Sequence, residues 1–229
     1  MKKLILSFSA LVLSILMYAQ CNPYFPLQEG TSWAYESFDA KGKLTGKNEM
    51  SVIEYNPNAN GYTAVVGTVI YDQKGKELTR GEFEYVCEDG VVYIDMRRFI
   101  AEEQLKTMSA YEIKLESENL EIPSQLRPGQ TLKDGSISFT ATNAPIATSM
   151  NVRISDRVVE GKENITTPAG SFESFKIKSK STSTMRMGIN INAEFSSIDW
   201  YAENVGMVRS ESYNKSGKLT GYTVLSKKP

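Results

Sequence analysis

The sequence has no histidine and very few cysteines or tryptophans, with two of each among 229 residues. Without imidazole, a protein cannot build a Ser-His-Asp or Cys-His catalytic arrangement, a histidine metal ligand or a histidine pH switch. No phosphate-binding glycine loop or nucleophile motif stands out either. We therefore expect no catalytic residues, no metal and no cofactor.

The sequence also lacks an excess of either charge, with 26 Lys and Arg residues against 27 Asp and Glu residues. A protein that binds nucleic acid needs surplus positive charge to neutralise the phosphate backbone. The balance argues against a nucleic-acid partner. The hydrophobic fraction of 41% and the charged fraction of 23% are ordinary for a globular protein, which argues against extended disorder.

Long hydrophobic runs are absent after the first twenty residues. Lys2 and Lys3 precede an apolar stretch from Leu4 to Met17, and the small residue Ala19 follows. This order is typical of a secretory signal, and the stretch is shorter than the about 20 residues of a membrane-spanning helix. We predict that residues 1–20 are a signal peptide, that the protein is exported to the periplasm or cell envelope, and that it has no transmembrane span.

The two cysteines, Cys21 and Cys87, leave two alternatives open. Two cysteines in an oxidising compartment most simply form a disulfide. Alternatively, Cys21 directly follows the signal and would be the lipidated residue of a lipoprotein, with Cys87 free. The preceding residue, Gln20, fits a lipoprotein signal poorly, which favours the disulfide.

Hydrophobic and polar residues alternate in twos along most of the chain, which indicates an all-β, mainly antiparallel fold. The clearest alternation runs from Met185 to Phe195 and predicts one continuous strand. Its interior face would hold Met185, Met187, Ile189, Ile191 and Phe195, and its exterior face Arg186, Asn190, Asn192 and Glu194. Shorter runs predict ten further strands, at residues 31–38, 50–55, 62–71, 78–87, 91–95, 136–142, 151–160, 172–179, 205–213 and 219–226.

Turn residues divide these strands. Asp89-Gly90 lies between two apolar runs and predicts a hairpin over Phe83–Asp95. The stretch from Asp39 to Gly46 resembles that from Asn214 to Gly221, and Tyr71–Thr79 is a looser third copy. We interpret these copies as recurrent hairpin tips rather than as cation or glycan loops.

One short helix is predicted over residues 96–108, where Asp95 can cap the first turn and Arg98, Glu102 and Lys106 form a charge ladder. Residues 123–135 are rich in Pro and Gly and would join two halves of one β-rich domain, residues 21–229.

Aromatic residues are the remaining functional signal. Trp33 and Tyr35 share one face of a predicted strand, and Trp200 lies near the end of another. Aromatic residues at such positions fill a core by default, but they would also line an apolar cavity in a curved sheet. The candidate ligand-lining residues are Trp33, Tyr35, Met185, Met187, Ile189, Ile191, Phe195 and Trp200.

Three stretches resemble a known family: Tyr24-Phe25-Pro26-Leu27 with Gly30, Trp33 and Tyr35; Thr167–Phe172 with Phe175; and Trp200-Tyr201-Ala202 with Val205–Val208. Together they resemble the TapB-like family of exported bacterial proteins, a family of unknown function. The resemblance implies an all-β domain similar in pattern to lipoprotein-carrier half-barrels, in which a curved sheet shelters an apolar groove.

Three functions follow as hypotheses. The first is a non-enzymatic envelope protein that binds an apolar small molecule or lipid in its curved sheet. The second is an envelope module with a filled core that binds another protein. The third is a hydrolase that uses carboxylates. An apolar cavity would favour the first, an exposed apolar patch the second, and converging carboxylates the third.

Overall fold

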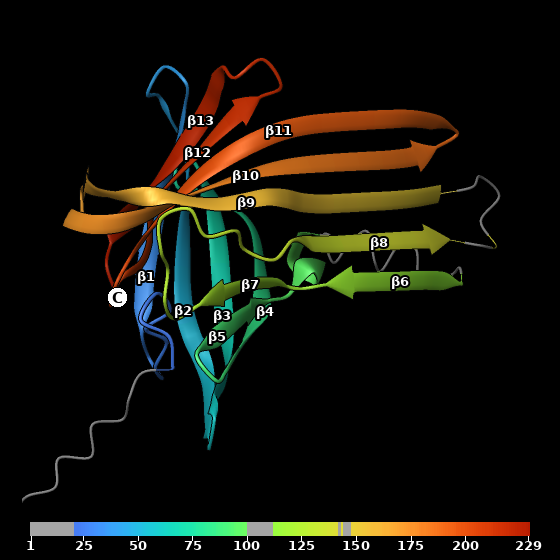
Figure 1. Cartoon of the computed structure of the whole chain (residues 1–229). Helices are drawn as coiled ribbons and strands as arrows, with labels where there is room; N and C mark the ends of the chain where they lie inside the picture. The colour runs from blue at the N-terminus through green and yellow to red at the C-terminus, as the bar shows by residue number, and fades with distance from the viewer. Residues whose placement is uncertain (1–20, 100–111, 142, 144–147) are drawn as a thin grey trace, which may run out of the picture.

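The computed structural model describes residues 21–99, 112–141, 143 and 148–229, and antiparallel strands dominate them (Figure 1). The strands are β1 (Ser32–Asp39), β2 (Leu44–Asn58), β3 (Gly61–Asp72), β4 (Glu77–Glu88), β5 (Val91–Ile94), β6 (Ile113–Glu118), β7 (Leu120–Pro123), β8 (Gly135–Ala141), β9 (Thr148–Thr167), β10 (Gly170–Met187), β11 (Ile189–Ala202), β12 (Gly206–Asn214) and β13 (Leu219–Lys227). This confirms the all-β, antiparallel prediction.

All thirteen strands belong to one sheet, in the order β6-β8-β9-β10-β11-β12-β13-β1-β2-β3-β4-β5-β7. Its two edge strands, β6 and β7, are separated in sequence only by Asn119. The ends of the sheet are thereby brought together, and the sheet curves into a nearly closed barrel. The predicted curved sheet is confirmed, and it is closed further than a half-barrel.

A buried arginine bridges the seam between the two ends. Arg157 of β9 is 4% exposed, and its Nη1 donates hydrogen bonds to the backbone carbonyls of Glu121, at 3.1 Å, and of Lys133. The side chains of Lys133 and Glu121 form an ion pair of 2.7 Å on the surface above. Five donors in a planar fork allow one guanidinium to satisfy carbonyls from two segments at once. Arg157 therefore joins β9 to the edge strand β7.

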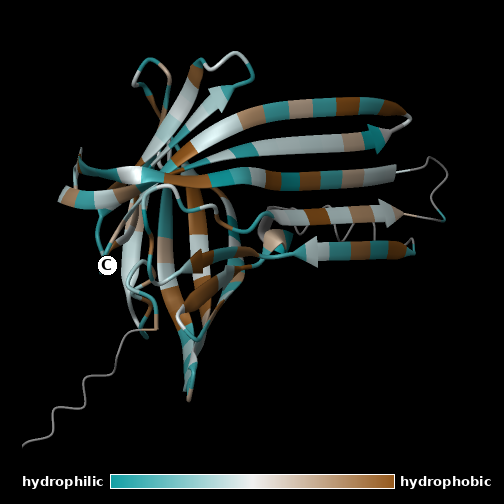
Figure 2. Cartoon of the chain, viewed as in Figure 1, coloured by the Kyte–Doolittle hydropathy of each residue, from teal (hydrophilic) through white to brown (hydrophobic). Residues whose placement is uncertain are grey.

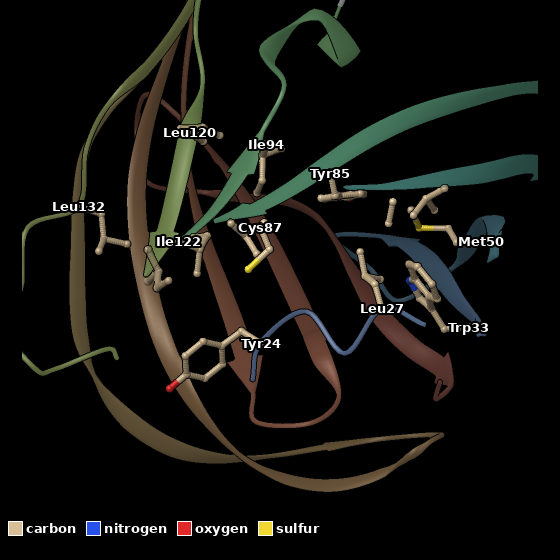
Figure 3. Close-up of a cluster of buried hydrophobic side chains, with 14 of the residues drawn as sticks. Tyr24, Leu27, Trp33, Met50, Tyr85, Cys87, Ile94, Leu120, Ile122 and Leu132 are labelled. Carbon is tan, nitrogen blue, oxygen red and sulfur yellow. The ribbon is translucent and has the colours of Figure 1, made fainter. Parts of the chain in front are cut away.

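The hydrophobic core lies inside the barrel. Hydrophobic and polar residues alternate along the strands (Figure 2), so each strand directs one set of side chains inward. Fully buried inward residues come from both halves of the sheet and include Ala64, Val66, Val92, Ile137, Val159, Val208 and Leu225. Tyr24 and Leu27, from the segment before β1, lie in the same cluster as Cys87 and Ile122 (Figure 3).

The three similar sequence stretches form three similar hairpin tips, as predicted. They join β1 to β2, β3 to β4 and β12 to β13. In the first, Asp39 Oδ1 accepts hydrogen bonds from the backbone nitrogens of Lys41 and Lys43, at 2.8 and 2.9 Å. Asp72 and Asn214 accept the equivalent pairs, and Gly42, Gly75 and Gly217 adopt φ of 80°, 80° and 74°. The motif is a turn structure, since its side-chain oxygen is used within the turn. The hairpin between β4 and β5 is also confirmed, with Asp89 and Gly90 at φ of 48° and 82°.

The prediction of one strand from Met185 to Phe195 is wrong. Gly188, at φ 76°, reverses the chain between β10 and β11, so that Met185 pairs with Ile191 and Met187 with Ile189. Directly paired residues of an antiparallel hairpin point to the same face. Both pairs join odd-numbered residues, so the alternation continues unbroken through the turn and resembles that of a single strand.

The interior assignment of this segment is also wrong for three residues. Ile189, Ile191 and Phe195 are 69%, 54% and 40% exposed, because the β10–β11 hairpin extends beyond the end of β12. Met185 is half-buried, and the side chain of Met187 lies outside the described residues. Arg186, Asn190, Asn192 and Glu194 are exposed, as predicted.

The predicted helix is reduced to one 3₁₀ turn, η1 (Met96–Phe99), within the described part of the chain. Asp95 does cap it, since its Oδ1 accepts a hydrogen bond of 2.8 Å from the backbone nitrogen of Arg97. The rest of the predicted helix, from residue 100 onward, and the predicted signal peptide lie outside the described residues. The described residues contain no helix long and apolar enough to cross a membrane.

Candidate functional site

The segment before β1 is fixed to the barrel by a disulfide and a buried amide. Cys21 is bonded to Cys87 of β4, which confirms the predicted pairing. Asn22 is fully buried, and its Nδ2 donates to the carbonyls of Gly90 and Ile122, at 3.1 and 2.8 Å. A sulfur in a disulfide cannot also carry a thioether-linked lipid, so the structure favours the disulfide over lipidation at Cys21.

The next residues of this segment lie across the inside of the sheet. The ring of Phe25 contacts those of Tyr85 and Tyr201, with centroid distances of 5.7 and 5.9 Å. The carbonyl of Phe25 accepts a hydrogen bond of 3.0 Å from the hydroxyl of Tyr62. Tyr24 packs edge-on against Phe175 at 6.1 Å. The segment is thus held by aromatic packing from both halves of the sheet.

An open cleft of about 440 Å³ lies between this segment and β1–β5, with β12 on the other side. Its apolar walls are formed by Tyr24, Phe25, Pro26, Leu27, Trp33, Tyr35, Met50, Ile70, Leu78, Tyr85, Ile94, Tyr201, Val205 and Met207. Several of these side chains are seen together in Figure 3, where Leu27, Trp33, Met50 and Tyr85 surround one region. The size and the aromatic lining are those of pockets that hold small apolar ligands.

Neutral polar groups form another part of the lining. Ser37 and Thr223 share a hydrogen bond of 3.0 Å between their hydroxyls, and Asn48 Oδ1 accepts one from Thr68. Lys47 is the one charged side chain among the described lining residues, and its Nζ lies 2.7 Å from Glu49 Oε1. Hydrogen bonding to Glu49 raises the pKa of Lys47, so the ammonium stays charged and paired. The cleft therefore presents apolar surface with hydroxyl and amide groups.

The predicted ligand-lining residues do not form one site. Trp33 and Tyr35 lie on the cleft wall, and the Tyr35 hydroxyl donates to the carbonyl of Met207 at 3.0 Å. Trp200 is buried elsewhere: its Nε1 donates to Glu163 Oε1 at 2.6 Å, and Arg209 lies over its ring at 5.9 Å. The structure therefore does not place Trp200 with Trp33 and Tyr35.

Two of the predicted residues of the β10–β11 hairpin, Met185 and Ile191, belong to a separate apolar row. Met185, Ile189, Ile191 and Phe195 do not line the cleft. Instead, strand pairing aligns Leu115, Phe139, Met150, Met185 and Ile191 across β6, β8, β9, β10 and β11. Because directly paired residues share a face, this row is a continuous apolar stripe on one side of the sheet.

Asp199 places a carboxylate on the inner face of β11, where it pairs with the buried residue Ile177. Asp199 accepts a hydrogen bond of 2.6 Å from Ser210, and Ser197 donates a weaker one at 3.4 Å. Burial raises the pKa of Asp199, while these hydroxyls and the charge of Arg157 act in the opposite direction. Acid–base hydrolysis by paired carboxylates needs a second acid nearby, whereas the hydrogen-bonding neighbours here are serines.

A second depression, of about 910 Å³, lies along β1–β4 and has polar walls. Its charged residues include Lys47, Glu49 and Arg80. Lys47 forms an ion pair with Glu49 at 2.7 Å, and Arg80 forms one with Glu77 at 2.8 Å. Its lining is more polar than that of the smaller cleft, so we regard the smaller cleft as the candidate site.

Sequence reasoning missed the contribution of residues 24–27 and of Met207 to the cleft. The pairing of Cys21 with Cys87 was the available signal, because it ties the segment after Cys21 to the inner strands. Met207 is brought opposite Tyr35 only by the sheet order, in which β13 separates β12 from β1. No local pattern predicts that order.

Comparison with known proteins agrees with the fold. A family model described as DUF3108-like matches residues 28–225. The chain is similar to a "putative exported protein with YmcC-like fold" from Bacteroides fragilis, with 25% identity and a TM-score of 0.70 over 91% of this chain and 100% of that one. It is also similar to a "putative lipoprotein" from Parabacteroides distasonis, with 24% identity and a TM-score of 0.72 over 92% and 100%. No curated protein matches the chain.

The fold and the cleft define an all-β protein with a nearly closed barrel-shaped sheet and an apolar site on its inner side. The chain belongs to the DUF3108-like family, whose model matches most of its length.

Proposed function

We propose that this protein is exported to the bacterial envelope and binds an apolar small molecule or lipid chain in the cleft, without catalysing a reaction. The observation that carries the proposal is the cleft itself. Exposed apolar residues at its rim, Ile70 and Leu78, lead to walls of buried aromatic and aliphatic side chains such as Trp33. Export is supported by the sequence of residues 1–20, by the disulfide and by the name of the Bacteroides fragilis protein. Membership of the TapB-like family is part of the same proposal.

The lining suits a chain-like ligand of variable shape. Met50 and Met207 have unbranched, polarisable side chains that adapt to different partners, and Trp33 and Tyr35 supply large apolar area. The neutral hydroxyl and amide groups at Ser37, Thr223 and Asn48 would meet a polar end of the ligand. A binding role requires only this arrangement and no chemical step.

The test is to purify the mature protein from a bacterial envelope, extract it with organic solvent and identify lipids by mass spectrometry. Ile70→Trp would fill part of the cleft from its rim, where Ile70 is 38% exposed. Ile53→Trp is the matched control, because Ile53 is 46% exposed and lies outside the cleft lining.

We expect co-purified lipid with the wild-type and Ile53→Trp proteins and a several-fold loss with Ile70→Trp. Absence of lipid from the wild-type protein, or equal lipid in both variants, would contradict the proposal. A second candidate function, binding of another protein, is favoured by a different observation: the exposed isoleucines of the β10–β11 hairpin.

A further inference from the structure

Strand β11 has a free edge over the first part of its length. It pairs with β10 from Ile189 to Ala202, but its pairing with β12 begins only at Phe195. Among the described residues, none pairs with Ile189–Glu194 on the outer side. In Figure 1 the β10–β11 hairpin extends away from β12 and β13, which leaves this edge accessible. An unpaired edge presents backbone donors and acceptors to another strand.

The side chains of this edge do not protect it from pairing. Natural edge strands usually carry lysines, prolines or bulges that discourage association. Residues 189–195 read Ile-Asn-Ile-Asn-Ala-Glu-Phe, without Lys or Pro. Glu194 is the only charged residue, and Lys180 of the neighbouring strand neutralises it at 3.2 Å.

The edge strand β6, unlike this part of β11, carries several charged side chains. Lys114 and Glu116 form an ion pair of 2.8 Å with side chains 73% and 65% exposed, and Glu118 is exposed as well. This edge carries the charges that oppose strand addition, while β11 exposes Ile189 and Ile191 instead. The difference points to β11 as the edge that accepts a partner.

The residues of β11 are complementary to themselves in antiparallel pairing. With Asn192 opposite the Asn192 of another copy, Asn190 meets Glu194 and Ile191 meets Ala193. Polar residues then pair with polar residues, apolar with apolar, and no two like charges are opposed. Ile189 of each copy would lie beside Phe195 of the other at the two ends of the short ladder.

We propose that two copies of this chain associate through β11, by antiparallel pairing of Asn190–Glu194 about a twofold axis through Asn192. Such isologous pairing is the usual symmetry of homodimers, and it extends the sheet from one copy into the next. The apolar row that ends at Ile191 would continue onto Ala193 of the second copy, so that Ile191 gains an apolar neighbour.

Position-specific cross-linking tests this geometry. Opposed residues of an antiparallel pair have Cα atoms about 4.5–5.5 Å apart, within the range that a disulfide spans. Asn192→Cys would place two such residues opposite each other. Asn190→Cys is the matched control, because residue 190 of each copy lies about 14 Å from its equivalent, four residues along the strand. Cys87 is fully buried in its own disulfide and does not compete.

We expect a cross-linked dimer from Asn192→Cys under mild oxidation and little from Asn190→Cys, on a non-reducing gel. We also expect light scattering to show concentration-dependent dimerisation, weakened about tenfold or more by Ile191→Lys. Ile53→Lys, at an exposed position on β2 outside the cleft lining, should leave it unchanged. Monomer at all concentrations up to about 1 mM, or equal cross-linking at both positions, would overturn the proposal.

Discussion

Replacing Arg157 with methionine tests the closure of the barrel. The guanidinium satisfies the backbone carbonyls of Glu121 and Lys133, and Arg157 is 4% exposed. Its loss leaves two part-buried acceptors without this donor, at about 1–3 kcal/mol each. Burial of the charged guanidinium lowers the pKa of Arg157 and is itself unfavourable. Methionine carries no charge and avoids this cost, which offsets part of the loss. We expect a net loss of about 3 kcal/mol in the free energy of unfolding.

Urea denaturation measures this loss. With a slope of about 2 kcal/mol per molar, the midpoint should fall by about 1.5 M. Arg80→Met is the control, because the side chain of Arg80 is 72% exposed and paired only with Glu77; it should shift the midpoint by little. Arg157→Lys keeps a positive charge but lacks the planar fork, so its effect should be intermediate. Equal midpoints for Arg157→Met and Arg80→Met would refute the role of Arg157 at the seam.

Three further predictions concern single residues. Purified mature protein should show no thiol that alkylates before reduction. Reduction of Cys21–Cys87, which are 66 residues apart, should lower the free energy of unfolding by about 4 kcal/mol. A diacylglycerol mass increment at Cys21 would contradict the disulfide. Burial raises the pKa of Asp199 above its unfolded value of 3.8. Between the two pKa values the folded state holds a proton that the unfolded state has lost. The free energy of unfolding therefore falls as pH rises above 3.8. Asp199→Asn should therefore raise the Tm near about pH 7 and change it little near about pH 4, and a uniform effect across pH would refute this. Ile191→Asp should lower the free energy of unfolding by less than about 1 kcal/mol, measured by chemical denaturation at low protein concentration, because Ile191 is 54% exposed. A loss of several kcal/mol would show that the residue is buried.

The sequence predicts most strands and turns because both depend on local chemistry. Alternation identifies strands such as β3 and β4 within one residue at each end, and the Asp or Asn that opens each repeated tip makes its hydrogen bonds within five residues. The same locality explains the failures. The turn at Gly188 joins residues of equal parity, so periodicity alone cannot reveal it. β6 was missed because it has only six residues and all but Ile113 are exposed, and β7 because it has only four residues.

The candidate site was only partly predictable, because it depends on the order of strands in the sheet. Trp33 and Tyr35 were correctly placed on one strand face, but their neighbours Met207 and Phe25 come from distant parts of the chain. Trp200, like Trp33, is a tryptophan on a predicted strand, yet its indole nitrogen donates a hydrogen bond to Glu163 away from the cleft. Which aromatic residue lines the cleft is therefore decided by tertiary packing.

The proposed ligand site is tested most directly with the two tryptophans as separate reporters. Trp200→Phe leaves Trp33, on the cleft wall, as the only tryptophan, and Trp33→Phe leaves only Trp200, outside the cleft lining. Each protein is titrated with a long-chain fatty acid and with a phospholipid while tryptophan emission is recorded. We predict a saturable change in the Trp33 protein and a flat response in the Trp200 protein. A flat response from Trp33, or equal responses from both proteins, would contradict ligand binding in the cleft.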